Sequence, residues 1–316
     1  MGLSKVSSRV ATTGLAGLVA LDVVLVGMAL RSNHVSGIDT SPVATASATV
    51  SPVRPSPTTP THSVSPSPTP TLPAASAPLQ VVLVALDSQR AWRVNVGSCG
   101  AAGAKVTTTT DGGKTWADAK APFGTIVRVR PTDSQAAFVI GSDSSCAPQL
   151  KSTSDGGGTW ASDSSVGNAW FRVPKNPRVV QAPGPSTSQP CGQHAVLDLA
   201  VLSVGSARVL CEDGLVRSTT DTGTSWTDSG RTAGAVALAV LPANPTQTYV
   251  ARLGVKACAG IQVLRLGKSV GTSCIKTALP QNAGQIALSL VDGGGWLAVG
   301  KETMRSTDGL ATWSLS

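Results

Sequence analysis

The feature that most constrains the fold is an eight-residue repeat motif, Ser/Thr-x-Asp-x-Gly-x-Thr/Ser-Trp, which occurs four times. Its copies span residues 109–116, 153–160, 219–226 and 306–313, and the last has Leu310 where the first two have a second glycine. Aspartate accepts hydrogen bonds from nearby backbone N–H groups, glycine supplies a positive φ, and Thr and Trp resume a strand. The repeat motif therefore predicts a tight turn between two strands in a protein built from similar units.

The spacing of the motif tryptophans predicts the architecture. Trp116 and Trp160 are 44 residues apart, the next interval is 66 residues, and the last is 87, nearly twice the first. This arithmetic predicts a unit without the motif, and residues 235–277 supply three strand-like segments followed by a plain turn at Gly267. A period in the low forties with four short strands per unit is typical of propeller blades. We expect an all-β propeller of four-stranded antiparallel blades, with five recognisable and a sixth if residues 161–190 form a degenerate half blade rather than a long insertion.

The repeat motif resembles the Asp box of sialidase-type repeat proteins, in which it lies between the third and fourth strands of propeller blades. The resemblance covers roughly residues 79–316. It implies a structural role, away from the ligand site, for the motif residues Asp111, Trp116, Asp155, Trp160, Asp221, Trp226, Asp308 and Trp313. We expect these tryptophans to be buried between sheets. The families that carry this repeat include glycosidases, sortilin-like sorting receptors and photosystem assembly factors, so the fold does not select a function.

The N-terminal part of the chain predicts a membrane attachment. Residues 1–9 form a positive tail, and residues 10–30 are apolar apart from two threonines and Asp22, which is long enough to cross a bilayer. We expect an uncleaved transmembrane signal anchor, because the run is longer than a usual signal core; cleavage after small residues near Ala29 is the alternative, and would give a secreted protein. Residues 31–78 are rich in Ser, Thr and Pro and predict a disordered stalk. Residues 79–316 would then be extracytoplasmic on a single-pass membrane protein.

Six cysteines, all C-terminal to the apolar run, predict three disulfides. In a four-stranded blade, the turns after the first and third strands lie on one face, and the second-to-third loops and the crossovers lie on the other. All six cysteines are expected on this second face. Their positions favour the pairs Cys99–Cys146, Cys191–Cys211 and Cys258–Cys274 among 15 conceivable pairings.

Catalytic signals are weak. The segment Phe171–Pro174 resembles the Phe/Tyr-Arg-Ile-Pro motif that supplies a carboxylate-binding arginine in sialidases, but here it follows two copies of the repeat motif instead of preceding them. Tyr249 is the single tyrosine, and neither glutamate, Glu212 or Glu302, is placed beside it by any motif. Several aspartates outside the repeat motif favour solvated hairpin positions over a catalytic pair, among them Asp87, Asp133, Asp143, Asp198 and Asp213.

Composition and motifs argue against several other classes. The net charge of +8 is spread without a Lys/Arg run, and aromatic residues are few, so we expect no nucleic-acid partner. His194 is the only histidine of the predicted domain, and Cys191 beside it is expected in a disulfide, so we expect no metal and no cofactor.

The function that these patterns favour is a membrane-tethered extracytoplasmic module that binds an unidentified protein or glycan partner of the cell envelope. The alternative is a sialidase-like glycoside hydrolase acting on extracellular glycans. For the binding surface we expect Trp170, Phe171 and Arg172 with the loop 183–190, all on the cysteine-bearing face.

The cysteine pattern generates a first prediction. Non-reducing peptide mapping of the exported protein should find no free thiol and should recover Cys258 linked to Cys274. A reactive Cys258 thiol in the native protein would contradict both the pairing and the strand register around Gly267.

Overall fold

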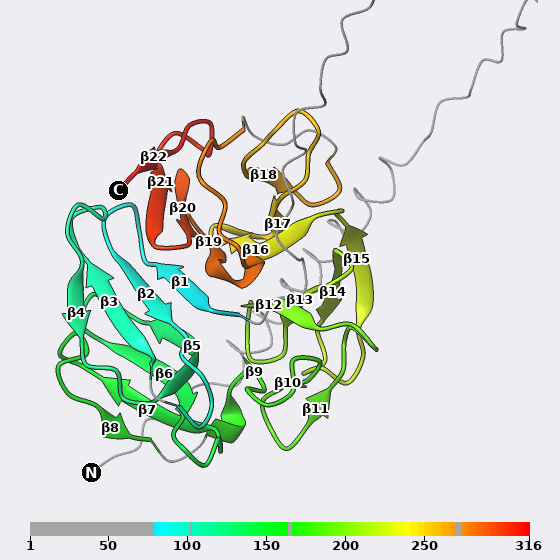
Figure 1. The fold of residues 1–316 in the computed structure, drawn as a ribbon. Helices are drawn as coiled ribbons and strands as arrows, with labels where there is room; N and C mark the ends of the chain where they lie inside the picture. The colour runs from blue at the N-terminus through cyan, green and yellow to red at the C-terminus, as the bar shows by residue number, and fades with distance from the viewer. Residues whose placement is uncertain (1–78, 102, 164–165, 269–273) are drawn as a thin grey trace, which may run out of the picture. The chain divides into compact units, whose positions relative to one another are not determined.

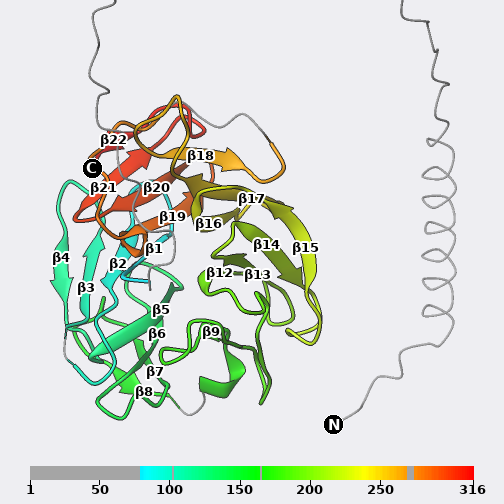
Figure 2. The same ribbon diagram turned by 45° about the vertical axis from the view of Figure 1, so that its right-hand side comes forward.

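The computed structural model describes residues 79–316 except 102, 164–165 and 269–273. Within these residues, six antiparallel sheets stand in a ring around a central axis (Figure 1; Figure 2). The fold is an all-β six-bladed propeller, in which four blades have four strands each. The sequence left the number of blades open between five and six, and the structure has six.

Blades 1, 2, 4 and 6 are four-stranded and carry the repeat motif. Blade 1 contains β1 (Val81–Ala85), β2 (Ala91–Asn95), β3 (Lys105–Thr109) and β4 (Ala117–Ala119). Blade 2 contains β5 (Thr125–Pro131), β6 (Ala137–Ser142), β7 (Gln149–Thr153) and β8 (Ala161–Ser162). Blade 4 contains β12 (Val196–Val201), β13 (Ala207–Cys211), β14 (Leu215–Thr219) and β15 (Thr227–Arg231). Blade 6 contains β19 (Ile286–Val291), β20 (Gly294–Val299), β21 (Glu302–Ser306) and β22 (Ser314–Leu315).

Blades 3 and 5 lack the motif and have three described strands each. Blade 3 contains β9 (Phe171–Arg172), β10 (Val180–Gln181) and β11 (Thr187–Ser188), preceded by the 3-10 helix η1 (Val166–Asn168). Blade 5 contains β16 (Ala235–Leu241), β17 (Asn244–Arg252) and β18 (Gln262–Arg265), and the 3-10 helix η2 (Ala283–Gln285) leads into blade 6. The motif-free unit predicted over residues 235–277 is confirmed as blade 5.

Two faces of the ring are defined by their loops. In each motif-bearing blade, the turn between the third and fourth strands hydrogen-bonds to the turn between the first and second; Gly112 N, for example, donates to the Gln89 carbonyl at 2.9 Å, and Gly156 N to the Gln135 carbonyl at 2.7 Å. These turns therefore lie on one face, the motif face. The opposite face carries the disulfides and is called the cysteine face.

Blade 3 runs in the opposite sense to the other five. The inner strands β1, β5, β12, β16 and β19 start at the cysteine face and end at the motif face. In blade 3, Trp170 Nε1 donates to the Val204 carbonyl on the motif face, whereas Val173 and Pro174 lie at the cysteine-face mouth of the ring. The inner strand β9 is thus reversed. Residues 161–190 were expected either as half a blade or as an insertion, and they form a blade whose inner strand is only two residues long.

Hydrophobic contacts between neighbouring blades form the core. In the described residues, each of the six blade interfaces has its own cluster of buried side chains. The cluster between blades 2 and 3 has only Ile140, Ala169 and Phe171 fully buried. The core is therefore a ring of interfaces, thinnest beside the short blade 3.

Tryptophan pairs connect three of these interfaces. The motif tryptophan of one blade packs edge to face against a tryptophan of the preceding blade, at centroid distances of 6.4, 6.2 and 6.1 Å. The pairs are Trp160 with Trp92, Trp116 with Trp296, and Trp226 with Trp170. The partner tryptophans are fully buried, whereas the motif tryptophans, Trp313 included, are only half-buried. The expectation that the motif tryptophans themselves are buried is thus wrong in degree, because each indole covers the rim of the interface and its partner fills the interior.

The ring closes between blades 1 and 6 without a shared strand. Every strand of blade 1 comes from the start of the domain and every strand of blade 6 from its end. Side chains hold this seam: Ala85 N donates to Ser289 Oγ at 3.0 Å, Trp296 Nε1 to the Asp87 carbonyl at 2.9 Å, and Arg305 Nη1 to the Ser88 carbonyl at 2.7 Å. The pair Trp116 and Trp296 spans the same seam.

Three disulfides join the loops of the cysteine face. They pair Cys99 with Cys146 between blades 1 and 2, Cys191 with Cys211 at blade 4, and Cys258 with Cys274 at blade 5, with Cα atoms 5.4–5.5 Å apart. These are the three pairings that the sequence favours. Closing loops of 16 to 47 residues contributes about 3–4 kcal/mol per bridge in the chain-entropy account.

The predicted membrane anchor, residues 10–30, and the stalk, residues 31–78, lie outside the described residues. Within the described part of the chain, no helix is long and apolar enough to cross a membrane.

The tryptophan pairs generate a second prediction. Trp92→Ala should cost about 3–5 kcal/mol of unfolding free energy because it empties a fully buried site, and Trp160→Ala should cost less, about 1–3 kcal/mol, because that indole is half-buried. Denaturant unfolding of both variants and of the double variant checks this. The pair should show a coupling of about 0.5–1.5 kcal/mol; strictly additive losses would contradict the contact.

Candidate functional site

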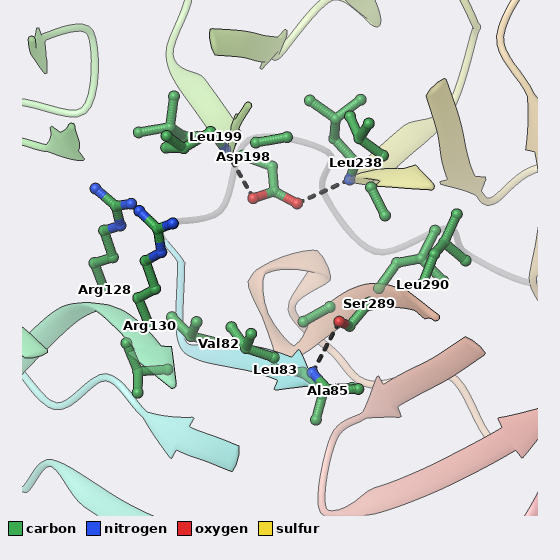
Figure 3. Close-up of a pocket in the computed structure, with 18 of the residues that line it drawn as sticks. Val82, Leu83, Ala85, Arg128, Arg130, Asp198, Leu199, Leu238, Ser289 and Leu290 are labelled. Atoms are coloured by element: carbon green, nitrogen blue, oxygen red, sulfur yellow. Dashed lines mark hydrogen bonds between the residues drawn. The ribbon is translucent and has the colours of Figure 1, made fainter. Parts of the chain in front are cut away.

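The central channel is the main cavity that the described residues form. It has a volume of about 520 Å³ and is lined by the inner strands of all six blades. Most lining side chains are aliphatic, among them Val82, Leu199, Leu238 and Leu290 (Figure 3). Among the described residues, the charged side chains of this lining are Arg128, Arg130, Arg172 and Asp198. A cavity of this size, with mostly aliphatic lining side chains and a few placed polar groups, is typical of a ligand site.

Asp198 connects blade 4 to blade 5. Its Oδ1 accepts the amide of Leu199 at 2.8 Å, and its Oδ2 accepts the amide of Leu238 in the next inner strand at 2.8 Å (Figure 3). Burial raises the pKa of Asp198, and the Leu238 amide and the Arg172 charge oppose that rise. The carboxylate therefore satisfies backbone N–H groups that an inner strand would otherwise leave unpaired at the channel.

Two arginines make the reciprocal connection through carbonyl groups. Arg172 donates Nη1 to the carbonyls of Val196 and Leu197 at 2.7 and 2.6 Å, which joins blade 3 to blade 4. Arg128 donates Nη1 to the Trp170 carbonyl and lies over the Phe138 ring at 5.3 Å, which joins blade 2 to blade 3. Burial lowers the pKa of both guanidinium groups to about 10, still far above neutral pH.

Ser289 completes this set at the seam, where its hydroxyl accepts the Ala85 amide. Arg130 differs from the other polar residues of the channel. It is exposed, and within the described residues its guanidinium has no hydrogen bond or ion pair. The channel thus holds three side chains committed to the backbone of the next blade, a serine at the seam and one uncommitted cation.

A second cavity of about 380 Å³ opens at the cysteine-face end of the channel. Its walls include Val96, Cys99, Val173, Pro174 and Pro177, and Arg172 lines both cavities. The Thr125 hydroxyl also lines it and is buried without a hydrogen-bond partner.

The residues expected on a recognition surface lie in three different surroundings: inside blade interfaces, at the cavities, and on both faces of the ring. Trp170 and Phe171 are 1% and 3% exposed and pack inside the interfaces of blade 3, so their side chains are not on the surface. Arg172 reaches both cavities, and a binding role for it stays a prediction. The 183–190 loop is divided, because the reversed blade 3 puts Pro183 on the motif face and Pro190 next to Cys191 on the cysteine face.

The four repeat motifs form nearly identical turns between third and fourth strands, as the sequence predicts. In the first copy, Asp111 Oδ1 accepts the Thr109 hydroxyl at 2.8 Å and the Thr115 amide at 3.0 Å, and Oδ2 accepts the Thr115 hydroxyl at 2.6 Å. Leu310 of the fourth copy adopts φ 74° where the other copies have glycine, and its side chain is buried in the core shared with blade 5. In the first two copies, a Cβ at the equivalent Gly113 or Gly157 would lie under 3 Å from a neighbouring side chain.

The other aspartates divide into two groups. Four accept backbone amides inside their own turns, as expected; these are Asp87, Asp133, Asp143 and Asp213. Asp198 was expected in the same class, and this is wrong, because it lies in the middle of β12 and points into the channel. A charged residue within an otherwise apolar strand was the signal for Asp198 and for Arg128.

The residues needed for sialidase-like chemistry do not converge. The Tyr249 hydroxyl donates to Gln247, Glu212 accepts the Ala195 amide, and Glu302 accepts the Thr277 hydroxyl. Nor, in the part of the chain that the structure describes, do three His, Cys, Asp or Glu residues form a group that could hold a metal ion.

Comparison with known proteins adds only distant likenesses. No family model and no curated protein sequence matches this chain. Among solved structures, YCF48 bound to D1 peptide is 17% identical over 78% of this chain and 82% of its own, with a TM-score of 0.38. The SapL1 lectin in complex with alpha methyl fucoside is 9% identical over 78% and 98%, with a TM-score of 0.47. The GH74 xyloglucanase from Xanthomonas campestris is 14% identical over 74% and 37%, with a TM-score of 0.29. No site or activity is carried over at these levels of similarity.

The motif turns generate a third prediction. Hydrogen bonds from Thr or Ser hydroxyls and amides lower the pKa of Asp111, Asp221 and Asp308 to about 2, below the unfolded value of about 3.9. A lowered carboxyl pKa stabilises the fold above about pH 4, and this stabilisation is lost as the pH falls toward 2. Asp111→Asn should therefore lower stability at pH 6 and make it less sensitive to acid than that of the wild type.

Urea unfolding at intervals from pH 6 to pH 2 measures this difference. If the variant and the wild type lost the same free energy of unfolding between pH 6 and pH 2, the charge of Asp111 would not be what stabilises the first motif.

Proposed function

We propose that residues 79–316 are a binding module that takes a protein or glycan partner at the mouths of the central channel. The observation that carries the proposal is the composition of the channel: a cavity of about 520 Å³ whose lining side chains are mostly aliphatic, with a few fixed polar groups among which Asp198 is the single carboxylate of the described lining. Glycoside hydrolysis normally needs two carboxyl groups about 5–9.5 Å apart on either side of the bond that is cleaved. The channel supports binding better than hydrolysis.

Asp198 is also poorly suited to general acid or base catalysis. Both of its oxygens accept backbone amides, from Leu199 and Leu238. Moving a proton on this carboxyl group would weaken a contact between blades 4 and 5. The polar groups of the channel therefore serve the rigidity of the ring, which favours a preformed binding surface.

We further propose that the module works in the cell envelope, on a single-pass protein whose residues 10–30 anchor it and whose C-terminal domain is extracytoplasmic. Three disulfides support an oxidising compartment. The apolar run and the Ser/Thr/Pro-rich segment that follows it support a tethered domain. The solved structures with similar folds include YCF48 bound to D1 peptide and a lectin in complex with a fucoside. A protein partner or a glycan partner would suit this proposal.

Photo-crosslinking from the intact full-length protein in its own envelope tests the proposal. A photoreactive residue replaces Pro242 at the motif-face mouth or Pro177 at the cysteine-face mouth, and a matched probe replaces Ser229 on the outer strand β15. We expect a specific adduct from one mouth and none from Ser229, and the purified partner should then bind the purified chain directly.

Adducts from Ser229 alone, or release of sugars from envelope glycans by the purified chain, would overturn the proposal. Replacing residues 175–190 with a flexible linker is not a suitable test of the surface, because these residues form β10 and β11 and their removal would destroy blade 3.

A further inference from the structure

Because blade 3 is short, two arginines of blade 2 line the part of the channel next to it. Arg128 and Arg130 are two residues apart on β5 and project side by side into the channel (Figure 3). The neighbouring inner strand β9 has only two residues, so the longer β5 faces a gap along that side. Arg128 is held in place by the Trp170 carbonyl and the Phe138 ring, whereas Arg130 is exposed.

The charge of this wall is not balanced by its surroundings. Among the described lining residues there are three guanidinium groups and one carboxylate, which leaves two positive charges in excess. Asp198 forms no ion pair with any of them and accepts backbone amides instead. Burial, followed by the like charge of the neighbouring Arg130, lowers the pKa of Arg128.

We propose that Arg128 and Arg130 form a binding site for the phosphate group of a small phosphate monoester. The dianion of a phosphate monoester brings two negative charges and three terminal acceptor oxygens, which match two neighbouring guanidinium groups that need two charges compensated. A single carboxylate would leave one of those charges unbalanced. The uncharged part of the ligand lies against the aliphatic side chains of Val82, beside Arg130, and of Leu238 and Leu290 farther round the channel.

The direction of entry follows from the position of Arg130. It is the second-last residue of β5, which ends at Pro131 on the motif face, so the phosphate is held near the motif-face mouth. Asp198 lies on β12 of blade 4, beyond the short blade 3, and its negative charge keeps the phosphate toward β5 (Figure 3). The inference goes beyond the proposed partner binding and does not rest on it.

Calorimetric titration of the purified full-length chain in a neutral detergent at pH 8 tests this site. The probes are glycerol 3-phosphate and, at equal ionic strength, sodium acetate. We expect glycerol 3-phosphate to bind the wild type and acetate to give no comparable binding. Arg130→Gln should weaken glycerol 3-phosphate binding by about tenfold or more, because the charge-assisted bonds from the Arg130 guanidinium to the phosphate are lost.

Arg265→Gln is the matched control, since Arg265 is an exposed arginine of β18 outside the channel, and it should bind the probe as the wild type does. Arg130→Lys keeps the charge and loses the planar fork, so its affinity should fall between those of the wild type and Arg130→Gln. All three variants should melt as the wild type does, because the Arg130 guanidinium has no partner among the described residues.

Three results would overturn the site. The first is that the wild type does not bind glycerol 3-phosphate at about 10 mM, since a specific ligand of such a pocket would bind more tightly than that. The others are wild-type affinity in Arg130→Gln, and binding of acetate as tight as that of the phosphate probe. Each of these concerns the purified chain alone. A failed search for an envelope partner would leave them unaffected, so the two proposals fail separately.

Discussion

The packing of one blade against the next is the interaction on which the whole ring depends. Within a blade, strands pair only with their neighbours in sequence, and the backbone contacts between described blades are isolated ones, such as Ile126 N to the Val96 carbonyl at 2.9 Å. A motif tryptophan from the following blade supplies that connection at three interfaces, through the pairs Trp160 with Trp92, Trp116 with Trp296 and Trp226 with Trp170. Large aromatic pairs suit this role because they bury much area and prefer a defined edge-to-face geometry.

Two of the charged residues of the channel span interfaces that have no tryptophan pair, whereas Arg172 joins blades 3 and 4 beside the pair of Trp170 and Trp226. Blades 3 and 5 have no motif, so the interfaces between blades 2 and 3 and between blades 4 and 5 have no tryptophan pair. These two interfaces are spanned by Arg128 and by Asp198, through the Trp170 carbonyl and the Leu238 amide. Arg128 and Asp198, which connect the blades where a tryptophan pair is missing, also place charged groups in the channel. The candidate site is thus a by-product of how the irregular blades are held.

The sequence was most informative where a residue pattern repeats. The motif spacing predicted the propeller, the turn positions and the motif-free blade 5, and the placement of cysteines after second strands favoured the three pairings that the structure forms. These features depend on local turn chemistry and on the period of the blade.

Blade 3 could not be predicted in the same way, because its strands are two residues long and carry no periodic signal. Trp170 and Phe171 are buried, although the sequence suggested a surface, because they fill the interfaces of blade 3 with blades 4 and 2. Asp198 was grouped with turn aspartates because its local neighbours do not show that its partner is Leu238, forty residues away. Arg130 was missed for a related reason: nothing near it in sequence shows that the inner strand facing it is short.

The closure between blades 1 and 6 has a mechanical consequence. Since no strand is shared there, side-chain contacts hold the two ends of the ring together. The contact of Ala85 with Ser289, for example, joins residues 204 positions apart in the sequence. Every other blade is linked to the next by a covalent crossover. The chain can assemble blade by blade and close this joint last. Opening this joint would separate buried side chains and break the bond from Gln80 N to the Gly284 carbonyl, but it would leave the strand pairing of every described sheet intact.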